Sequence, residues 1–334
     1  MEDTLLEVRD LQVEFSTKMG IVRVLDKVNL KVDPRQTVGI IGESGCGKSM
    51  MALSIMGLVP IPPGRIAGGE ILYRGTDLLT LEKDAILDIR GKRIAMIFQE
   101  PMNSLNPVFT VGNQLVETLL RHEDMTRRDA WDKSVDMLKA VGIPSPEKRM
   151  HDYSFQMSGG MRQRVMIAIA LACEPKLLIA DEPTTALDVT IQAQILELMQ
   201  ELRKKLGMSI IMITHDLGVV ASMCEKIAVM YAGHIVEYGT TDEIFYQPGH
   251  EYTKGLINSI PKLNTEVRER LVPIEGTPVD LLNPPAGCPF APRCKNCMKI
   301  CLSKMPPRTE LSDTHYTYCW LQQKAAFEKG EKAE

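Results

Sequence analysis

A glycine-rich segment near the amino end of the sequence has the pattern of a phosphate-binding loop. Its residues, Gly42-Glu-Ser-Gly-Cys-Gly-Lys48-Ser49, match G-x-x-x-x-G-K-[ST] at every fixed position and directly follow the apolar run 37–41. Glycines let backbone N–H groups wrap phosphate oxygens where a Cβ would collide, and the helix that follows adds its positive end. Lys48 is expected to reach the β- and γ-phosphates, and Ser49 to supply a ligand to Mg²⁺. The residues predicted to bind a nucleoside triphosphate are Gly42, Ser44, Gly45, Cys46, Gly47, Lys48, Ser49 and Met50.

Two acidic residues and one histidine stand directly after two other apolar runs. Asp181 follows the run 176–180, where a carboxylate can hold Mg²⁺ through water, and Glu182 can polarise a water that attacks the γ-phosphorus. His215 follows the run 209–214. By themselves, an acidic pair and a histidine at the ends of strands are equally compatible with structural roles. Their interpretation therefore depends on the other motifs of the chain.

A second glycine-rich segment decides between these interpretations. Ser158-Gly159-Gly160 stands at the start of an apolar helix, where backbone amides can grip a phosphate. The phosphate loop, this segment, the acidic pair and the histidine, in this order, resemble the ATP-binding subunit of an ABC transporter. Pro183 and Ala186-Leu187-Asp188 also follow the acidic pair as they do in that family.

The resemblance implies a role for each motif. Glu182 would be the catalytic carboxylate, His215 would contact the γ-phosphate, and Gln99, which ends the apolar run 94–98, would sense Mg²⁺. Ser158-Gly159-Gly160 would contact an ATP held by the phosphate loop of an opposing subunit, in a head-to-tail dimer that encloses two ATPs. The implied catalytic residues are Glu182, His215, Lys48 and Gln99, and the implied Mg²⁺ ligands are Ser49, Gln99 and Asp181.

Three further positions refine the nucleotide site. The commonest signature of the family is Leu-Ser-Gly-Gly-Gln, whereas this chain has Met157-Ser-Gly-Gly-Met161, which keeps the Ser-Gly-Gly core. The resemblance places Asp188 among the residues that contact ATP. It also places Phe15 where an aromatic ring stacks on adenine, although a half-buried aromatic of a strand is the alternative.

Other segments resemble the peptide and nickel importers, and in particular the D-type ATP-binding subunits of dipeptide and oligopeptide permeases. The segments are Phe98-Gln-Glu-Pro-Met-Asn-Ser-Leu-Asn-Pro107, Gly249-His-Glu-Tyr-Thr-Lys-Gly-Leu256 and Gly287-Cys-Pro-Phe-Ala-Pro-Arg-Cys294. The family usually has His-Pro-Tyr-Thr, so Glu251 is a departure. The implied partners are two transmembrane permease subunits, a homologous second ATPase or a second copy of this chain, and, indirectly, an extracytoplasmic peptide-binding protein.

Five of the eight cysteines lie between residues 288 and 319, a density that favours metal binding over disulfides in a cytosolic protein. A compact run of thiols with one distant cysteine suits a [4Fe–4S] cluster, and zinc is the alternative. By spacing alone, the Cys-x-x-Cys pair would keep Cys297 as a ligand. The resemblance instead implies Cys288, Cys294, Cys301 and Cys319 as the cluster ligands. Structural stapling and redox sensing are both conceivable roles.

The elements that must position these residues follow from apolar periodicity. Short strands are expected at 6–8, 11–15, 22–24 and 28–32, and buried strands at 94–98, 176–180, 209–214 and 227–231. Helices are expected at 50–58, over most of 110–142, at 158–171 and at 190–206, with a break at 60–69. Buried strands that alternate with helices indicate a mostly parallel α/β sheet.

We therefore predict an α/β fold of the P-loop NTPase ABC-cassette type, with a RecA-like parallel core, an antiparallel β subdomain and a helical subdomain. The nucleotide-binding domain would span 1–245, with the helical subdomain at about 100–170. Dense prolines and cysteines mark a separate small domain at 246–322, and a charged tail follows at 323–334.

Composition limits the alternatives. The formal net charge of −4 gives no basic field that would suggest nucleic acid as a partner. No apolar run reaches the ~18 residues of a membrane span, and residues 1–10 lack the apolar core of a secretory signal. The expected location is the cytoplasmic face of the membrane. The rival interpretations are a soluble ABC ATPase and a redox-sensing regulator that uses the cysteine cluster.

Overall fold

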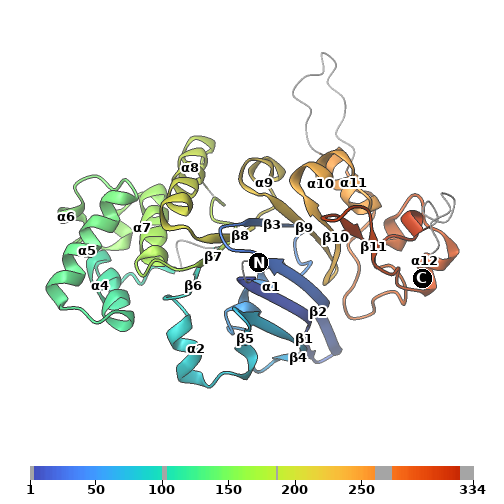
Figure 1. Cartoon of the computed structure of the whole chain (residues 1–334), viewed down its shortest axis with the longest axis horizontal. Helices are drawn as coiled ribbons and strands as arrows, with labels where there is room; N and C mark the ends of the chain where they lie inside the picture. The colour runs from blue at the N-terminus through green and yellow to red at the C-terminus, as the bar shows by residue number, and fades with distance from the viewer. Residues whose placement is uncertain (1–3, 100–103, 186, 260–272, 324–334) are drawn as a thin grey trace, which may run out of the picture. The chain divides into compact units, whose positions relative to one another are not determined.

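The computed structural model describes residues 4–99, 104–185, 187–259 and 273–323, and the chain divides into two compact units (Figure 1). The first unit comprises residues 1–5, 32–37 and 73–213, and the second comprises 6–31, 38–72 and 214–334. The predicted tail beyond residue 323, residues 100–103 of the Phe98–Pro107 motif, and Ala186 lie outside the described residues. None of the helices in the described part of the chain combines the length and the apolarity that a membrane span requires.

The first unit contains three parallel strands, β6 (Ile94–Ile97), β7 (Leu177–Asp181) and β8 (Ser209–Ile213). The strand β7 lies between the other two, and Leu177 faces Ile94 on one side and Ser209 on the other. Every residue of β7 and β8 is buried, which explains why these strands are apolar throughout instead of alternating. The predicted buried strands at 94–98, 176–180 and 209–214 are thereby confirmed.

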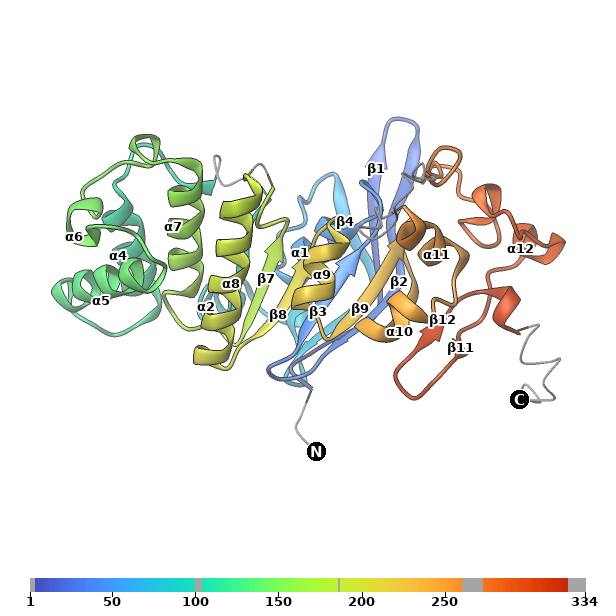
Figure 2. The same ribbon diagram turned by 90° about the horizontal axis from the view of Figure 1, so that it is seen from above.

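The longer helices of the first unit each begin with a side-chain cap. They are α2 (Lys83–Ile89), α4 (Val111–His122), α5 (Arg127–Ala140), α6 (Pro146–Arg149), α7 (Gly159–Leu171) and α8 (Val189–Leu206), with the short elements β5 (Thr76–Asp77), η1 (Leu78–Thr80) and η2 (Ser154–Gln156). Figures 1 and 2 show α4 to α7 gathered in one group and α8 beside α7. Thr110 and Thr126 cap α4 and α5, so the helical stretch predicted over 110–142 is two helices. Gly207, in the left-handed conformation, ends α8 directly after the helix predicted at 190–206.

The first sheet of the second unit contains the strands β2 (Gly20–Val32), β1 (Leu6–Thr17) and β4 (Gly64–Tyr73), in that order. The four short strands predicted for this region are in fact two long ones. Asp10 and Lys27 lie inside them with positive φ values of 44° and 50°, and these local irregularities interrupt the apolar alternation in the sequence. The break predicted at 60–69 is also partly wrong, because β4 begins at Gly64.

The second sheet of this unit begins with a parallel pair and continues antiparallel. Val38 of β3 (Thr37–Ile41) faces Lys226 of β9 (Lys226–Tyr231) in parallel, and β10 (His234–Thr240) then pairs antiparallel with β9. The pairs β10–β12 (Tyr316–Thr317) and β12–β11 (Thr309–Glu310) extend the sheet. The remaining elements are α1 (Lys48–Ile55), α9 (Leu217–Met223), α10 (Thr241–Tyr246), α11 (Glu251–Asn258), η3 (Ala291–Arg293) and α12 (Lys299–Ser303).

The segment predicted as a separate domain, residues 246–322, is called the appendage below. Its strand β12 pairs with β10, and the fully buried carboxylate of Glu237 in β10 accepts hydrogen bonds from the backbone N–H groups of Gly249 and His250 at 2.5 and 2.9 Å. A ring nitrogen of His315 lies 2.7 Å from the same carboxylate. The appendage shares a sheet and buried polar contacts with the rest of the second unit, so a separate small domain is not confirmed.

Candidate nucleotide-binding and catalytic site

The phosphate loop lies between β3 and α1, and its glycines are required by close backbone packing. A Cβ on Gly42 would lie 2.1 Å from the carbonyl oxygen of Met230, and one on Gly47 would lie 2.9 Å from that of Val24. Gly47 also has a φ of 108°, which side chains other than glycine rarely adopt. The loop can therefore bring its N–H groups close to a phosphate only with glycine at these positions, as the motif predicts.

Lys48 is held by the loop itself. Its ammonium group donates to the carbonyl oxygens of Gly42 and Glu43 at 2.8 and 2.9 Å, and the side chain is only 6% exposed. Burial raises the pKa of the neighbouring Cys46 thiol, which keeps this thiol protonated and a poor nucleophile near neutral pH. The predicted role of Lys48 at the phosphates is compatible with this position at the start of α1.

The predicted catalytic carboxylate lies at the end of β7 in the first unit. Glu182 has a φ of 47°, a strained conformation for a non-glycine residue, and its N–H donates to the carbonyl oxygen of Ile213 at 2.8 Å. Its Oε2 accepts hydrogen bonds from Nε2 of Gln99 at 3.1 Å and from the hydroxyl of Thr185 at 2.9 Å. Asp181, the residue before it, is buried. The structure thus brings together Gln99, Asp181 and Glu182.

The Ser158-Gly159-Gly160 segment begins α7, as predicted. The hydroxyl of Ser158 caps the helix by accepting from the N–H of Met161 at 3.4 Å, and a Cβ on Gly159 would meet no other atom within 4 Å. This end of the helix is therefore open on the side of Gly159. Asp188, predicted to contact ATP, accepts from the N–H of Ile191 at 3.0 Å and caps α8.

Sequence reasoning missed two residues that position this part of the site. The hydroxyl of Thr185 orients Glu182, and the amide of Gln163 in α7 donates to the carbonyl oxygen of Pro183. The second bond ties the helix of the Ser-Gly-Gly segment to the loop that carries Glu182. Their proximity in sequence to Glu182 and Ser158 is the signal that could have identified both.

His215 and Phe15 belong to the second unit. His215 follows β8 with an exposed side chain. The next residue, Asp216, caps α9 by accepting from the N–H groups of Gly218 and Val219. Phe15 is half-buried, and its ring lies 3.0 Å from the position of a Cβ on Gly64. Adenine stacking by Phe15, and the assembly of these residues with Glu182 around one ATP, stay predictions.

The predicted iron–sulfur cluster and its zinc alternative are not confirmed by the structure. Among the described residues, no three side chains of histidine, cysteine, aspartate or glutamate are placed so that they could hold one metal ion. Burial raises the pKa of Cys288 to about 12 and that of Cys294 to about 11, so both thiols are protonated at neutral pH in the metal-free chain. Cys301 and Cys319 are likewise buried free cysteines, whereas Cys297 is exposed.

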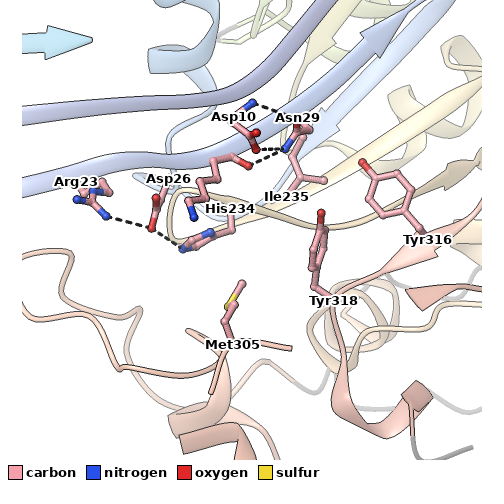
Figure 3. Close-up of a pocket in the computed structure, with 10 residues that line it drawn as sticks. Asp10, Arg23, Asp26, Asn29, His234, Ile235, Met305, Tyr316 and Tyr318 are labelled. Atoms are coloured by element: carbon pink, nitrogen blue, oxygen red, sulfur yellow. Dashed lines mark hydrogen bonds and ion pairs between the residues drawn. The ribbon is translucent and has the colours of Figure 1, made fainter. Parts of the chain in front are cut away.

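A cavity of about 370 Å³ lies elsewhere in the second unit, between β1, β2 and β10 and the appendage (Figure 3). Asp26 accepts from Arg23 at 3.5 Å and lies 4.0 Å from His234, and Asp10 accepts from Asn29 at 3.0 Å. Burial lowers the pKa of His234, so its ring is neutral at neutral pH. The polar groups of the cavity thus pair largely with one another, and none of the residues predicted to bind ATP lines it.

Comparison with known proteins defines the class of protein. Residues 25–185 match the family profile described as "ABC transporter". The solved structure described as a dimeric post-hydrolysis state of the ATP-binding cassette MJ0796 bound to ADP and Pi is 26% identical, with a TM-score of 0.64, and covers 71% of this chain and 98% of its own. Together with the phosphate loop and the Glu182 site, these similarities define an ABC-type ATPase.

Relatives of known function narrow this class. The oligopeptide transport ATP-binding protein OppD of Bacillus subtilis is 55% identical over 95% of this chain and 88% of its own length. The dipeptide transport ATP-binding protein DppD of the same organism is 52% identical over 97% and 96%, and OppD of Escherichia coli is 50% identical over 95% and 93%. Residues 236–301 also match the profile "Oligopeptide/dipeptide transporter, C-terminal region". The chain belongs to the family of oligopeptide and dipeptide ABC transporter ATP-binding proteins.

Proposed function

We propose that this chain hydrolyses ATP at the cytoplasmic face of the membrane to drive the import of short peptides through partner permease subunits. The observation that carries the proposal is the geometry of Glu182, whose carboxylate is oriented by Gln99 and Thr185 at the end of a buried strand. Relatives that match this chain over 95% or more of its length are oligopeptide and dipeptide transport ATP-binding proteins, which supports peptides as the substrate. A soluble ATPase or a redox regulator is not favoured, because neither would need this full-length similarity.

The described residues fit ATP and Mg²⁺. The close packing at Gly42 and Gly47 holds the loop in a conformation that only glycine allows there, as a phosphate loop requires, and the buried Asp181 at the end of β7 suits a metal site. Mg²⁺, when bound through Ser49, Gln99 and Asp181, would neutralise charge on the β- and γ-phosphates. Lys48 would bind the same oxygens.

Hydrolysis then depends on a few groups of the protein. Glu182 would accept the proton of the attacking water, and His215 would contact the γ-phosphate. The Ser158-Gly159-Gly160 segment of a second subunit, either a copy or a homologue, would complete the site. ATP binding would close this dimer, and hydrolysis would reopen it and move the permease subunits.

The Glu182→Gln variant tests the catalytic role. Hydrolysis should fall about 10²–10⁴-fold, because the amide cannot accept a proton, while ATP binding persists and holds a closed dimer. Phosphate release and size-exclusion chromatography with ATP measure the two effects. The control is Glu197→Gln, an exposed carboxylate on α8 that should leave both unchanged. Hydrolysis at the wild-type rate in Glu182→Gln would refute the role.

Reconstitution tests the substrate. The chain, assembled in vesicles with its permease subunits, a second ATPase if one is required, and the peptide-binding protein, should accumulate a labelled dipeptide or oligopeptide only with ATP. Uptake of Ni²⁺ without uptake of peptides would overturn the peptide assignment and keep the ATPase assignment.

We propose further that Cys288, Cys294, Cys301 and Cys319 take up a [4Fe–4S] cluster, with zinc as the alternative. Backbone hydrogen bonding at Phe290, Asn296 and Leu321 lowers the pKa of Cys288, Cys294 and Cys319 against the rise caused by burial, which favours thiolates. Apart from burial, the three other sulfurs also raise the pKa of Cys288, so they lie within its electrostatic range.

Cys297 is exposed, whereas these four cysteines are buried or half-buried. The thiol of Cys297 donates to the carbonyl oxygen of Met298 at 3.5 Å, the role of a neutral thiol. Iron and sulfide analysis of protein purified without oxygen should give about four of each. Cys294→Ala should abolish this content and Cys297→Ala should preserve it. Zinc in the iron-free protein would select the alternative, and no metal at all would overturn the proposal.

A further inference from the structure

We propose that Arg293 and Tyr252 of the appendage are positioning residues for ATP binding, which act on the phosphate loop through Glu43. This inference rests on the ATPase function, and it assigns a role to residues that lie more than 200 positions away from the loop in sequence. Glu43 occupies a variable position of the loop motif, so the motif itself gives its side chain no task.

The guanidinium of Arg293 is fully used. It donates to both carboxylate oxygens of Glu43, at 2.6 and 2.9 Å, in a forked ion pair. Its remaining N–H groups donate to the hydroxyl of Tyr231 at 3.3 Å and to the carbonyl oxygens of Ile274 at 3.2 Å and Glu275 at 3.0 Å. The Arg293 side chain is 5% exposed and that of Glu43 is 26% exposed, so the arginine end of the pair is shielded from water. A forked, shielded pair fixes both the distance and the orientation of the Glu43 side chain.

Tyr252 holds the backbone of the same residue. The N–H of Glu43 donates to the Tyr252 hydroxyl at 2.8 Å. Tyr252 itself is fully buried, with its ring centre 4.6 Å from that of Tyr231 and 5.4 Å from that of Phe290. The ring therefore cannot move without displacing its neighbours, and it fixes the position of the hydroxyl.

All the polar groups of Glu43 are thus engaged. The appendage binds its carboxylate and its N–H, and Lys48 binds its carbonyl oxygen at 2.9 Å. Glu43 joins Gly42, which packs against the backbone of Met230, to the glycine turn of the loop. A loop that binds phosphate by its N–H groups tolerates little displacement of its backbone. The appendage therefore helps to set the geometry in which Lys48 and the loop N–H groups meet ATP.

The first experiment compares three variants of the full-length chain. ATP hydrolysis gives KM and kcat, and a fluorescent ATP analogue gives Kd. Arg293→Ala should raise KM and Kd about tenfold, equivalent to about 1.4 kcal/mol, with kcat changed less. Tyr252→Phe, which removes only the hydroxyl, should raise both about threefold. Arg308→Ala should change neither, because Arg308 lies over Tyr316 in the appendage and pairs with Glu310.

Two further variants test the route through Glu43. Arg293→Lys should not restore KM, because an ammonium group cannot make the forked pair. The double variant Glu43→Gln/Arg293→Ala should be no worse than Arg293→Ala alone. An additive loss in the double variant would show that Arg293 acts elsewhere and would overturn the proposed route.

A purely structural role predicts a different result. The melting temperature of Arg293→Ala and Tyr252→Phe would then fall while KM and Kd stay within about twofold of the wild type, and this result would overturn the proposal. The Kd values are also measured in the Glu182→Gln background, where no hydrolysis is needed. A wild-type chain that binds but never hydrolyses ATP would refute the proposed function and leave this test intact.

Discussion

The phosphate loop (residues 42–49) and the cysteine segment (residues 288–319) both surround ionisable side chains with backbone groups, but the two kinds of backbone group differ. In the loop, the carbonyl oxygens of Gly42 and Glu43 accept hydrogen bonds from the ammonium of Lys48. In the cysteine segment, backbone hydrogen bonding at Phe290 and Asn296 acts to lower the pKa of Cys288 and Cys294. Carbonyl oxygens stabilise a cation and N–H groups stabilise an anion. The backbone of each region is therefore fitted to one charged form of the side chain it encloses.

The two regions differ in whether that charged form exists without a ligand. A lysine side chain carries its charge at neutral pH in water. A cysteine does not, and burial outweighs the N–H donors, so the pKa of Cys288 rises to about 12. In the proposed cluster, a metal ion would supply the missing positive charge. The backbone therefore suits the charged form of Lys48 directly, whereas the thiolates of the cysteine segment would need the proposed cofactor.

Removal of the Lys48 ammonium group tests the phosphate loop and should have a larger effect on ATP hydrolysis than substitution of His250 or Cys297. In Lys48→Ala, the phosphates lose their ammonium partner and the carbonyl oxygens of Gly42 and Glu43 lose their donor. We expect hydrolysis to fall by about 10²–10³-fold and ATP binding to weaken. Lys139→Ala, which removes an exposed ammonium from α5, should leave both unchanged. Hydrolysis within twofold of the wild type in Lys48→Ala would contradict the assignment.

The phosphate loop could be predicted from the sequence because its function depends on the backbone. Only glycine fits where Gly42 and Gly47 pack against other backbone, so the constraint appears as a residue type at a fixed spacing. The buried strands β7 and β8 were predictable for a similar reason, since burial on both faces requires apolar residues throughout. In contrast, β11 and β12 are two residues long each, too short to produce any periodicity.

Contacts between distant segments could not be predicted in this way. The pair Arg293–Glu43 joins a variable position of the loop to an arginine next to Cys294, and neither residue alone signals the other. The departure at Glu251 became clear only in the structure, where its carboxylate accepts from Lys254 and from Asn296, both at 2.7 Å. A sequence motif shows which residue types a position can accommodate, but it does not show which distant residue that position contacts.

A lower pH should reduce the stability of the protein through His250, the residue that precedes α11. This helix contains Tyr252 and precedes the cysteine segment. Burial lowers the pKa of His250 from 6.5 to about 4, so the unfolded chain binds this proton more tightly than the folded chain. The contribution of neutral His250 to the free energy of unfolding is fully present above pH 6.5. It decreases by about 3 kcal/mol as the pH falls from 6.5 towards 4.

Urea unfolding between pH 7 and pH 4 measures this effect. In the wild type, Nδ1 of His250 accepts a hydrogen bond from the N–H of Tyr252 at 3.1 Å. His250→Asn keeps an acceptor for this N–H but removes the titratable ring, so it should flatten this part of the pH dependence. The exposed His151, changed to Asn, is the matched control and should leave the slope unchanged. An equal slope in the wild type and in His250→Asn would show that other groups cause the loss.

Thiol reactivity gives the smallest effect and tests the second half of the comparison. In the native, metal-free protein, the exposed Cys297 should react with a maleimide at least about tenfold faster than Cys288, Cys301 and Cys319, which are buried. Cys297→Ala should remove this fast phase, whereas Cys301→Ala should keep it. Loading with iron and sulfide should then protect the slow thiols and leave the fast one reactive, because N–H groups and metal would act on the same sulfurs. Protection of Cys297 together with the other thiols would instead place Cys297 among the cluster ligands. Exposure of a cysteine would then no longer distinguish the spare cysteine from the ligands.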